Sequence, residues 1–463
     1  MRNPDPIAYL LAARIPTQRP HDPMYTDHRQ HFLAQLQGIG ACALIPTNPT
    51  RTRSADTEFR FRPSSDFWYL TGFAEPDSWL LLLPAPKGSD EPHRSILFLR
   101  EKDKTMEIWN GLRLGVTDAP SKLGVDEAYD VEDLWSRLPE HLEGHKRLVF
   151  ATGLCNDNDA ALLKTLSGLR DRVRSGVQAP MEILDPGPLL HELRLFKTPG
   201  EIEVMRKAAA ITDEAHREVM ATTRPGTNEC ELDALLEYTF RRKGGTGAAY
   251  GNIVAGGANA CILHYVENNA TLQDGDICLV DAGCEFDFYA SDVTRSFPIS
   301  GQFTEAQKSV YTVVLNAQLA AIDQCQPGNT FLSVHEVALG VLVRGLIELG
   351  LCKGTPDEVL EDESYREWYM HRTGHWMGLD VHDCGSYHTG DKSRSLEPGM
   401  VLTVEPGIYI AADAQNAPSA LRGIGIRIED DILITADGHE NLSAAIPKTI
   451  EDVEAACALV TQG

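Results

Sequence analysis

Short apolar runs bounded by turn-forming residues recur in the first third of the chain. Residues 79–83 and 95–99 are two such runs, and runs of this length between proline and glycine predict buried strands. Residues 67–70 form a third run, followed by Thr71-Gly72, and predict a strand that ends in a turn. We therefore expect a β-sheet in this part of the chain.

Helical patterns alternate with these strands. Residues 156–169 predict a helix, and residues 131–138 predict a shorter one that ends at Pro139, because proline lacks the amide hydrogen that a helix interior uses. The run Asp-Pro-Gly-Pro at 185–188 is the strongest break in the chain. The pattern predicts an α/β domain over residues 1–185.

The remaining residues, 186–463, follow a different plan that occurs twice. Each round has two long helical patterns separated by a Pro-Gly stop, and then several strand runs. Capping boxes predict the helix starts of the second round, Thr304 with Gln307 and Ser333 with Glu336. Chance recurrence of common stop signals is the alternative to a duplicated α+β domain. The predicted elements are helices over 201–220, 229–242, 304–324 and 333–350, with strand runs over 253–297 and up to 435.

Two aspartates lie on consecutive predicted strands. Asp281 ends the apolar run 277–280, and Asp292 begins the alternating run 292–297. If residues 286–287 form a two-residue turn, the two aspartates are directly opposed, with Cβ atoms about 4.5–5.5 Å apart. Two buried carboxylates at that distance repel, so one takes up a proton or a cation lies between them. Two unrelated surface aspartates are the alternative.

Two glutamates follow the later strands. Glu405 comes directly after the predicted apolar strand 402–404, and Glu429 follows a run in which isoleucines alternate with polar residues. Arg427 and Glu429 share the face opposite the isoleucines, so a solvent-facing ion pair is the alternative for this glutamate. Histidines are dense between these strands, with three in twelve residues and a fourth earlier: His371, His375, His382 and His264.

Four carboxylates and one imidazole form a hard, oxygen-rich ligand set. Their charge of about −4 is balanced by two divalent cations, and Mn²⁺ or a similar first-row ion suits such ligands. Two such ions can activate a bridging hydroxide and polarise a carbonyl, which indicates a hydrolase. The motifs of zincins, α/β-hydrolases, P-loop proteins and dinucleotide-binding folds do not occur in the chain.

Composition narrows the setting. The 463 residues include 67 acidic and 42 basic side chains, for a net charge of −25, which disfavours binding to nucleic acid or to an anionic membrane surface. The most apolar N-terminal run, residues 7–13, is too short to span a membrane and lacks the basic leader of a secretory signal. Ten scattered cysteines without Cys-x-x-Cys pairs favour reduced thiols and a cytoplasmic location.

At this point the chain resembles the pita-bread metallopeptidases, and within them the bacterial aminopeptidase P group. The resemblance rests on the order and spacing of motifs in the catalytic half and on others before it. The catalytic motifs are VDAG at 280–283, SDVTRSF at 291–297, the segment 371–378, VHD at 381–383, TVEPG at 403–407 and GIRIED at 425–430. The earlier ones are DFWYLTGF at 66–73, EIWNG at 107–111 and HELRLFK at 191–197.

The resemblance implies a role for each matching position. The metal ligands would be Asp281, Asp292, His375, Glu405 and Glu429, with Asp292 and Glu429 bridging both ions. Glu405 would also take the proton of the bridging water, and His382 would stabilise the tetrahedral intermediate. The proline pocket would be formed by His264, His371 and Arg427. Trp109 matches a tryptophan that reaches a neighbouring subunit's site in relatives, which implies a homo-oligomer, a dimer or tetramer.

The implied activity is hydrolysis of the N-terminal Xaa-Pro bond of peptides through a hydroxide that bridges two metal ions, most simply Mn²⁺. A prolidase restricted to Xaa-Pro dipeptides is the first alternative, because the restriction depends on what blocks the far end of the cleft. A non-catalytic pita-bread binding module is the second, and the complete ligand set disfavours it.

Overall fold

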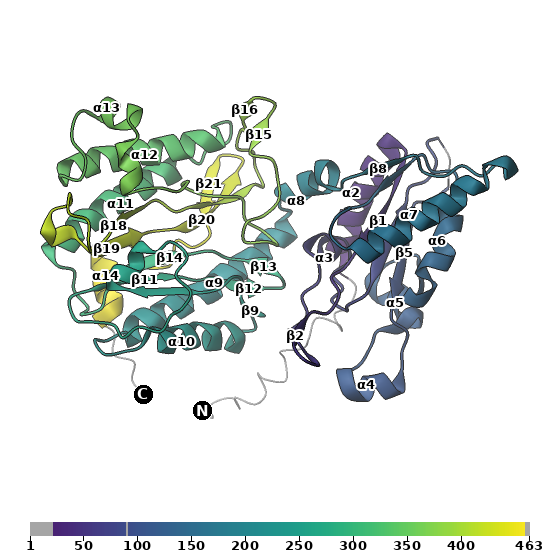
Figure 1. The fold of residues 1–463 in the computed structure, drawn as a ribbon, viewed down its shortest axis with the longest axis horizontal. Coiled ribbons are helices and arrows are strands. Elements are labelled where there is room, and N and C mark those ends of the chain that lie inside the picture. The colour runs from purple at the N-terminus through teal and green to yellow at the C-terminus, as the bar shows by residue number, and fades with distance from the viewer. Residues whose placement is uncertain (1–21, 89–90, 459–463) are drawn as a thin grey trace. The chain divides into compact units, whose positions relative to one another are not determined.

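The computed structural model describes residues 22–88 and 91–458, and it divides into two compact units that meet in sequence between Arg194 and Leu195 (Figure 1). The predicted division into 1–185 and 186–463 stays a prediction. The apolar run 7–13 lies outside the described residues. Within the described ranges, each helix is too short or too polar to cross a membrane.

A six-stranded mixed sheet forms the centre of the first unit. Its strands are β1 (Ala41–Pro46), β4 (Trp79–Leu83), β5 (Arg94–Leu99), β6 (Glu127–Asp130), β7 (Arg147–Val149) and β8 (Glu182–Leu184). They lie in the order β6-β5-β4-β1-β7-β8, with β4 antiparallel to both β1 and β5. The strands predicted at 79–83 and 95–99 are thus confirmed as the neighbours β4 and β5.

Helices join and cover these strands. They are α2 (Pro23–Ile39), α3 (Ser65–Thr71), α4 (Lys104–Asn110), α5 (Gly115–Leu123), α6 (Leu134–Leu142) and α7 (Asn156–Asp171). Helix α7 confirms the prediction over 156–169. Its buried face repeats at helical spacing and packs on the sheet through Leu162, Leu166 and Leu169.

Two predictions in this unit are wrong. Residues 67–70 belong to helix α3, because the Ser64 hydroxyl caps its first turn and Gly72, at φ +60°, ends it; a short apolar run does not distinguish a strand from a helix buried on both sides. Pro139 lies inside α6 and does not end it. The buried row of Leu134, Leu138 and Leu142 continues past the proline, and its packing outweighs one missing hydrogen bond.

The second unit confirms the duplicated α+β plan. Its first round comprises α9 (Pro199–Thr222), α10 (Glu229–Arg242), β9 (Gly247–Ala248), β10 (Ile253–Gly256), β11 (Ile277–Asp281), β12 (Cys284–Phe286), β13 (Tyr289–Ala290) and β14 (Thr294–Pro298). Its second comprises α11 (Glu305–Gln324), α12 (Phe331–Glu348), α13 (Pro356–Glu361), β15 (His388–Thr389), β16 (Lys392–Ser393), β17 (Val401–Val404), β18 (Gly407–Ile410), β19 (Ile424–Arg427), β20 (Asp430–Thr435) and β21 (Gly438–Asn441), before the final helix α14 (Ile450–Ala458). Figure 1 shows the strands between the helix pairs α9–α10 and α11–α12.

The capping signals of these helices decide where each begins. The box of Thr304 and Gln307 is present at the start of α11, as predicted. The prediction for α12 is wrong, because its capping box is formed by Thr330 with Ser333, and the helix begins at Phe331. Ser333 is therefore the last residue of the box and the third of the helix, which moves the helix start toward the N-terminus.

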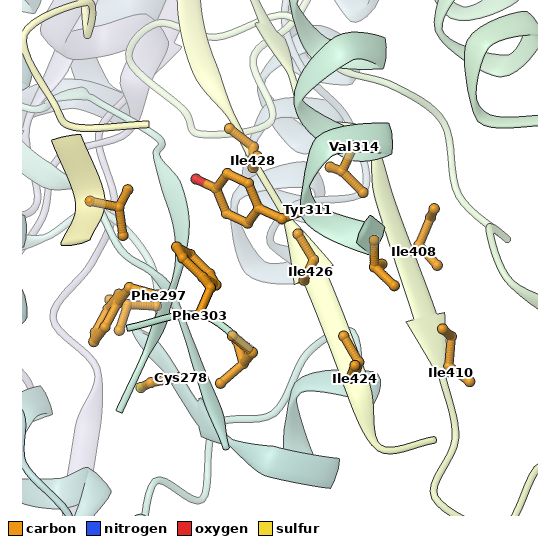
Figure 2. Close-up of a cluster of buried hydrophobic side chains, with 14 of the residues drawn as sticks. Cys278, Phe297, Phe303, Tyr311, Val314, Ile408, Ile410, Ile424, Ile426 and Ile428 are labelled. Carbon is orange, nitrogen blue, oxygen red and sulfur yellow. The ribbon is translucent and has the colours of Figure 1, made fainter. Parts of the chain in front are cut away.

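The core of the second unit lies between its strands and the long helices. Ile424, Ile426 and Ile428 point to one side, against Tyr311 and Val314 of α11 (Figure 2). The predicted alternation of this segment is thus confirmed. Since side chains on successive strand residues point to opposite faces, Arg427 and Glu429 are directed away from this apolar core.

The hairpin that carries the two aspartates differs from its predicted register. The turn residues are Asp287 and Phe288, both at positive φ (51° and 66°), and Asp281 pairs with Thr294 and not with Asp292. A turn displaced by one residue moves the pairing by two positions, so Asp292 keeps its face and lies diagonal to Asp281. The prediction of direct opposition is wrong, but both carboxylates remain on one side.

Candidate functional site

Carboxylates at or next to strand ends from both rounds of the second unit line one cavity of about 440 Å³. Asp281 ends β11, Asp292 precedes β14, Glu405 follows β17, and Glu429 lies between β19 and β20. All four side chains line this cavity. The strand ends therefore place four acidic groups around one space.

His375 enters the same cavity from an irregular segment that is held against β17. Its backbone amide donates to Thr403 Oγ1 at 3.2 Å, and its carbonyl accepts from the Thr403 amide at 2.9 Å. Its Nε2 atom lies 3.4 Å from Asp292 Oδ2 and 3.7 Å from Glu405 Oε1. One ligand atom each of Asp292, His375 and Glu429 fall within 4.8 Å of one another, a spacing that suits a shared metal ion.

The pair of aspartates is joined by a tyrosine that sequence reasoning did not identify. The Tyr250 hydroxyl is 2.6 Å from Asp281 Oδ1 and 2.5 Å from Asp292 Oδ1. Because a phenol has a single proton to donate, it can donate to only one of the two carboxylates at a time, and it leaves the charge of both in place. Tyr250 lies in a loop without periodicity, so no pattern in the sequence pointed to it.

The electrostatics of the cavity favour bound cations. Burial raises the pKa of Glu405 to about 7, and burial together with the charges of Asp292, Glu405 and Asp281 raises that of Glu429 well above its ordinary value. Burial also raises the pKa of Asp281, and the nearby Asp292 adds to this while Arg427 opposes it. The protein therefore supplies too little positive charge to keep these carboxyl groups ionised, and bound cations would supply the rest.

A fifth buried carboxyl group, Asp431, has an Oδ1 atom without a hydrogen-bond partner in the described part of the chain. Its other oxygen accepts from the Asp292 amide at 3.2 Å.

Two divalent cations would balance the four ligand carboxylates, and the mixture of carboxylate oxygens with one imidazole suits first-row metal ions. The residues present thus fit a dinuclear metal centre.

Three histidines that line the cavity differ in their pKa values and so in their charge. Burial lowers the pKa of His375, but its contacts with Asp292 and Glu405 outweigh burial and raise it to about 9. Burial and the charge of Arg427 lower the pKa of His371 to about 4, and burial with the neighbouring His375 lowers that of His382. His371 and His382 are therefore neutral donors or acceptors near pH 7.

Arg427 of β19 donates hydrogen bonds to side chains on three other strands. It donates to Asp281 Oδ2 at 2.6 Å, to Thr294 Oγ1 at 3.1 Å and to the hydroxyl of Tyr409 at 3.1 Å. That hydroxyl is also 2.8 Å from His371 Nε2. The alternative of a solvent-facing pair of Arg427 and Glu429 is thus wrong, because both side chains are buried.

Of the ten residues predicted for the site, nine line this one cavity. They are Asp281, Asp292, His375, Glu405, Glu429, His264, His371, His382 and Arg427. Trp109 belongs to the first unit, on α4, with 79% of its surface exposed. The structure adds residues to which no role was given: Tyr250, Tyr409, Thr294, Thr403 and Asp431. Of these, only Thr294 had a signal, since its alternation with Asp292 placed it on the same strand face.

Comparison with known proteins agrees with this geometry. Residues 203–436 match Metallopeptidase family M24, and residues 25–150 match the Aminopeptidase P, N-terminal domain. The chain is 46% identical to an Xaa-Pro aminopeptidase of Escherichia coli, over 92% of this chain and 96% of that protein. It is 36% identical to human Xaa-Pro aminopeptidase 3, over 93% of this chain and 85% of that protein.

Solved structures show the same likeness. Aminopeptidase PepP of Pseudomonas aeruginosa superposes with a TM-score of 0.91 at 44% identity, over 95% of this chain and 99% of that one. The Asp271Ala variant of Escherichia coli aminopeptidase P superposes with a TM-score of 0.92 at 43% identity, over 96% and 100%. Sequence motifs, fold and cavity therefore agree, and the chain belongs to metallopeptidase family M24, within its aminopeptidase P group.

Proposed function

We propose that this chain hydrolyses the bond between the first residue of a peptide and a proline in second position, with the help of two divalent metal ions. The observation that carries the proposal is the convergence of four carboxylates and His375 in one cavity that is also lined by His264, His382 and Arg427. The names of the related proteins support the choice of an Xaa-Pro substrate.

The proposed metal ligands are Asp281, Asp292, His375, Glu405 and Glu429, with Asp292 and Glu429 shared between the ions. Two bound divalent ions would lower the pKa of a shared water and polarise a peptide carbonyl. The hard ligand set favours Mn²⁺. The protein's part is to hold four carboxylates at or next to strand ends and His375 on a segment that is hydrogen-bonded to Thr403 of β17.

The chain's own residues then move protons and stabilise charge. Glu405 takes the proton released by the attacking water, a role that suits a carboxylate beside it. His382 stays neutral and donates a hydrogen bond to the carbonyl oxygen as negative charge develops, an effect worth about 3 kcal/mol per donor. Its ring centroid lies 4.3 Å from that of His375, so this donor is beside the ligands.

Recognition of proline follows from what its ring lacks. A bond to proline is a tertiary amide without an N–H, so a pocket for it needs shape and not a hydrogen-bond acceptor at that nitrogen. His264, His371 and Arg427 line the cavity and supply such a wall. The free amine of the first residue would bind near the acidic cluster, which limits cleavage to the N-terminal residue.

We also propose a cytoplasmic homo-oligomer, a dimer or tetramer. All ten cysteines, each within the described ranges, are free thiols, which suits a reducing compartment. The exposed indole of Trp109 lies on α4, where no residue is buried, and a large exposed aromatic side chain is typical of an interface. On this proposal a neighbouring subunit covers Trp109.

Turnover of a tripeptide and a dipeptide tests the proposed substrate. The Mn²⁺-loaded enzyme should release the first residue from Xaa-Pro-Yaa, as measured by liquid chromatography of the products. If the enzyme hydrolyses the dipeptide Xaa-Pro but not the tripeptide, the chain is a prolidase. If neither peptide is cleaved while the protein binds metal, a binding module would be the better reading.

The contribution of Glu405 to the stability of the metal-free protein should fall as pH rises from about 4.5 to about 7. In this window the folded protein keeps a proton on Glu405, whose pKa is raised to about 7, whereas the unfolded chain has released it. The loss amounts to roughly 3 kcal/mol for this group, since each pKa unit corresponds to about 1.4 kcal/mol. Urea denaturation at several pH values measures it. Glu405→Gln removes this contribution, while other groups, such as His371 with its pKa lowered to about 4, titrate in both proteins. The stability of the wild type relative to Glu405→Gln should therefore fall over this window, and a difference that stays constant or grows would contradict the prediction.

A further inference from the structure

We infer that Arg372 binds the C-terminal carboxylate of short peptide substrates, an inference that rests on the proposed function. Arg372 is exposed, and it lines the same cavity as the candidate ligands. It lies between His371 and His375 in the sequence, so its backbone is adjacent to the site. No role follows for it from the chemistry described so far.

The charge of Arg372 is unmatched. Arg427, the other arginine that lines the cavity, donates to Asp281 at 2.6 Å. The guanidinium of Arg372 has no hydrogen bond or ion pair to any residue within the described ranges, and only its backbone carbonyl is engaged, by His371 Nδ1 at 2.7 Å. Once two divalent ions balance the four ligand carboxylates, this side chain leaves a positive charge at the cavity that an anionic group of the substrate can meet.

The backbone beside Arg372 is well defined, because the two residues that follow it are held in place. Thr373 Oγ1 lies 2.8 Å from His335 Nδ1 and 2.7 Å from the Tyr369 hydroxyl, and a Cβ atom on Gly374 would lie 2.0 Å from the Thr403 carbonyl. The guanidinium is thus the exposed end of a long side chain on a backbone that is held in place. Such a group can reach a carboxylate and bind it through two parallel hydrogen bonds.

The surroundings of Arg372 suit the end of a peptide. Arg372 and Gly374 also line a second cavity of about 380 Å³, whose wall includes Phe331, Val334 and Leu402. A C-terminal residue offers a carboxylate beside its side chain and so matches a cation next to apolar space. In an extended tripeptide the terminal carboxylate lies about 7 Å beyond the carbonyl of the first residue, since each residue spans about 3.5 Å.

The test compares Ala-Pro-Leu with its C-terminal amide, which differs only in lacking the negative charge. The wild-type enzyme should prefer the acid by about tenfold in kcat/KM, mostly through KM, because a partly exposed charged pair gives a modest gain. In Arg372→Gln this ratio should fall to about one, and Arg372→Lys should restore part of it. The control Arg344→Gln removes the same charge from the exposed face of α12 and should keep the wild-type ratio.

A binding measurement separates this inference from the proposed function. Calorimetric titration with Pro-Leu and its amide reports the carboxylate preference without turnover. A preference that disappears in Arg372→Gln supports the inference whether or not hydrolysis occurs. An equal response to acid and amide in the wild type, or a preference that survives in Arg372→Gln, would overturn it. Absence of hydrolysis of either tripeptide would count against the proposed function alone.

Discussion

Asp281→Asn should lose nearly all peptidase activity and keep its fold. The carboxylate accepts from Tyr250 and Arg427 and is one of four whose charge the metal pair would balance. An amide of the same size keeps the packing but removes the charge and one acceptor oxygen. We expect kcat/KM to fall by about three orders of magnitude, which corresponds to about 4 kcal/mol in the barrier.

A control for this variant lies at the other end of the same strand. Asp276 directly precedes β11, outside the cavity, so Asp276→Asn makes the same chemical change away from the ligands. The kcat/KM of Asp276→Asn should stay within a factor of about two of the wild-type value, because substitutions away from buried and functional positions usually have small effects. Circular dichroism and thermal melting check that both variants are folded. Full activity in Asp281→Asn would refute the dinuclear proposal.

Removal of the metal ions should reduce activity to background, and Mn²⁺ should restore it. Without cations the buried carboxyl groups of Asp281, Glu405 and Glu429 have raised pKa values because burial disfavours their charge. Ions that bind only the folded protein also stabilise it, by about 2.7 kcal/mol at one hundred times the dissociation constant. Activity and melting temperature should therefore fall together on chelation and dialysis, and rise together on addition of Mn²⁺.

The matched comparison for metal removal is Asp281→Asn, since it lacks one proposed ligand. Its melting temperature should respond less to Mn²⁺ than that of the wild type at equal metal concentration. Metal content by elemental analysis should correlate with the recovered activity, with two ions per chain at full recovery. If the enzyme keeps its activity after elemental analysis finds no metal in it, the proposal that these carboxylates bind two ions needed for catalysis is wrong.

Local signals in the sequence were sufficient for many elements. The helical patterns of residues 156–169, 229–242 and 304–324 predicted α7, α10 and α11, and the capping box of Thr304 and Gln307 added a start signal for α11. The short elements were harder. Residues 67–70 are apolar on all sides in either conformation, so only the cap at Ser64 distinguishes helix from strand.

The candidate site shows a similar division. The order of motifs around Asp281, Asp292 and Glu405 indicated acidic residues at strand ends, and a resemblance between motifs requires no knowledge of the register. The turn at Asp287 and Phe288 was misplaced by one residue, because positive φ angles at both positions depend on how the flanking strands twist and pair. The prediction that Asp281 and Asp292 share a face of the sheet is unaffected by this error, because side chains on one face recur every two residues.

By itself, the sequence determined the duplicated α+β plan, the types of candidate ligand and the strand ends that carry most of them, since these depend on periodicity and on neighbours along the chain. Only the tertiary structure decided that Tyr250 lies between Asp281 and Asp292, that Arg427 is buried beside them and that the guanidinium of Arg372 has no partner among residues 22–88 and 91–458. Such contacts join segments dozens of residues apart, and they are set by how sheets pack and not by any local pattern.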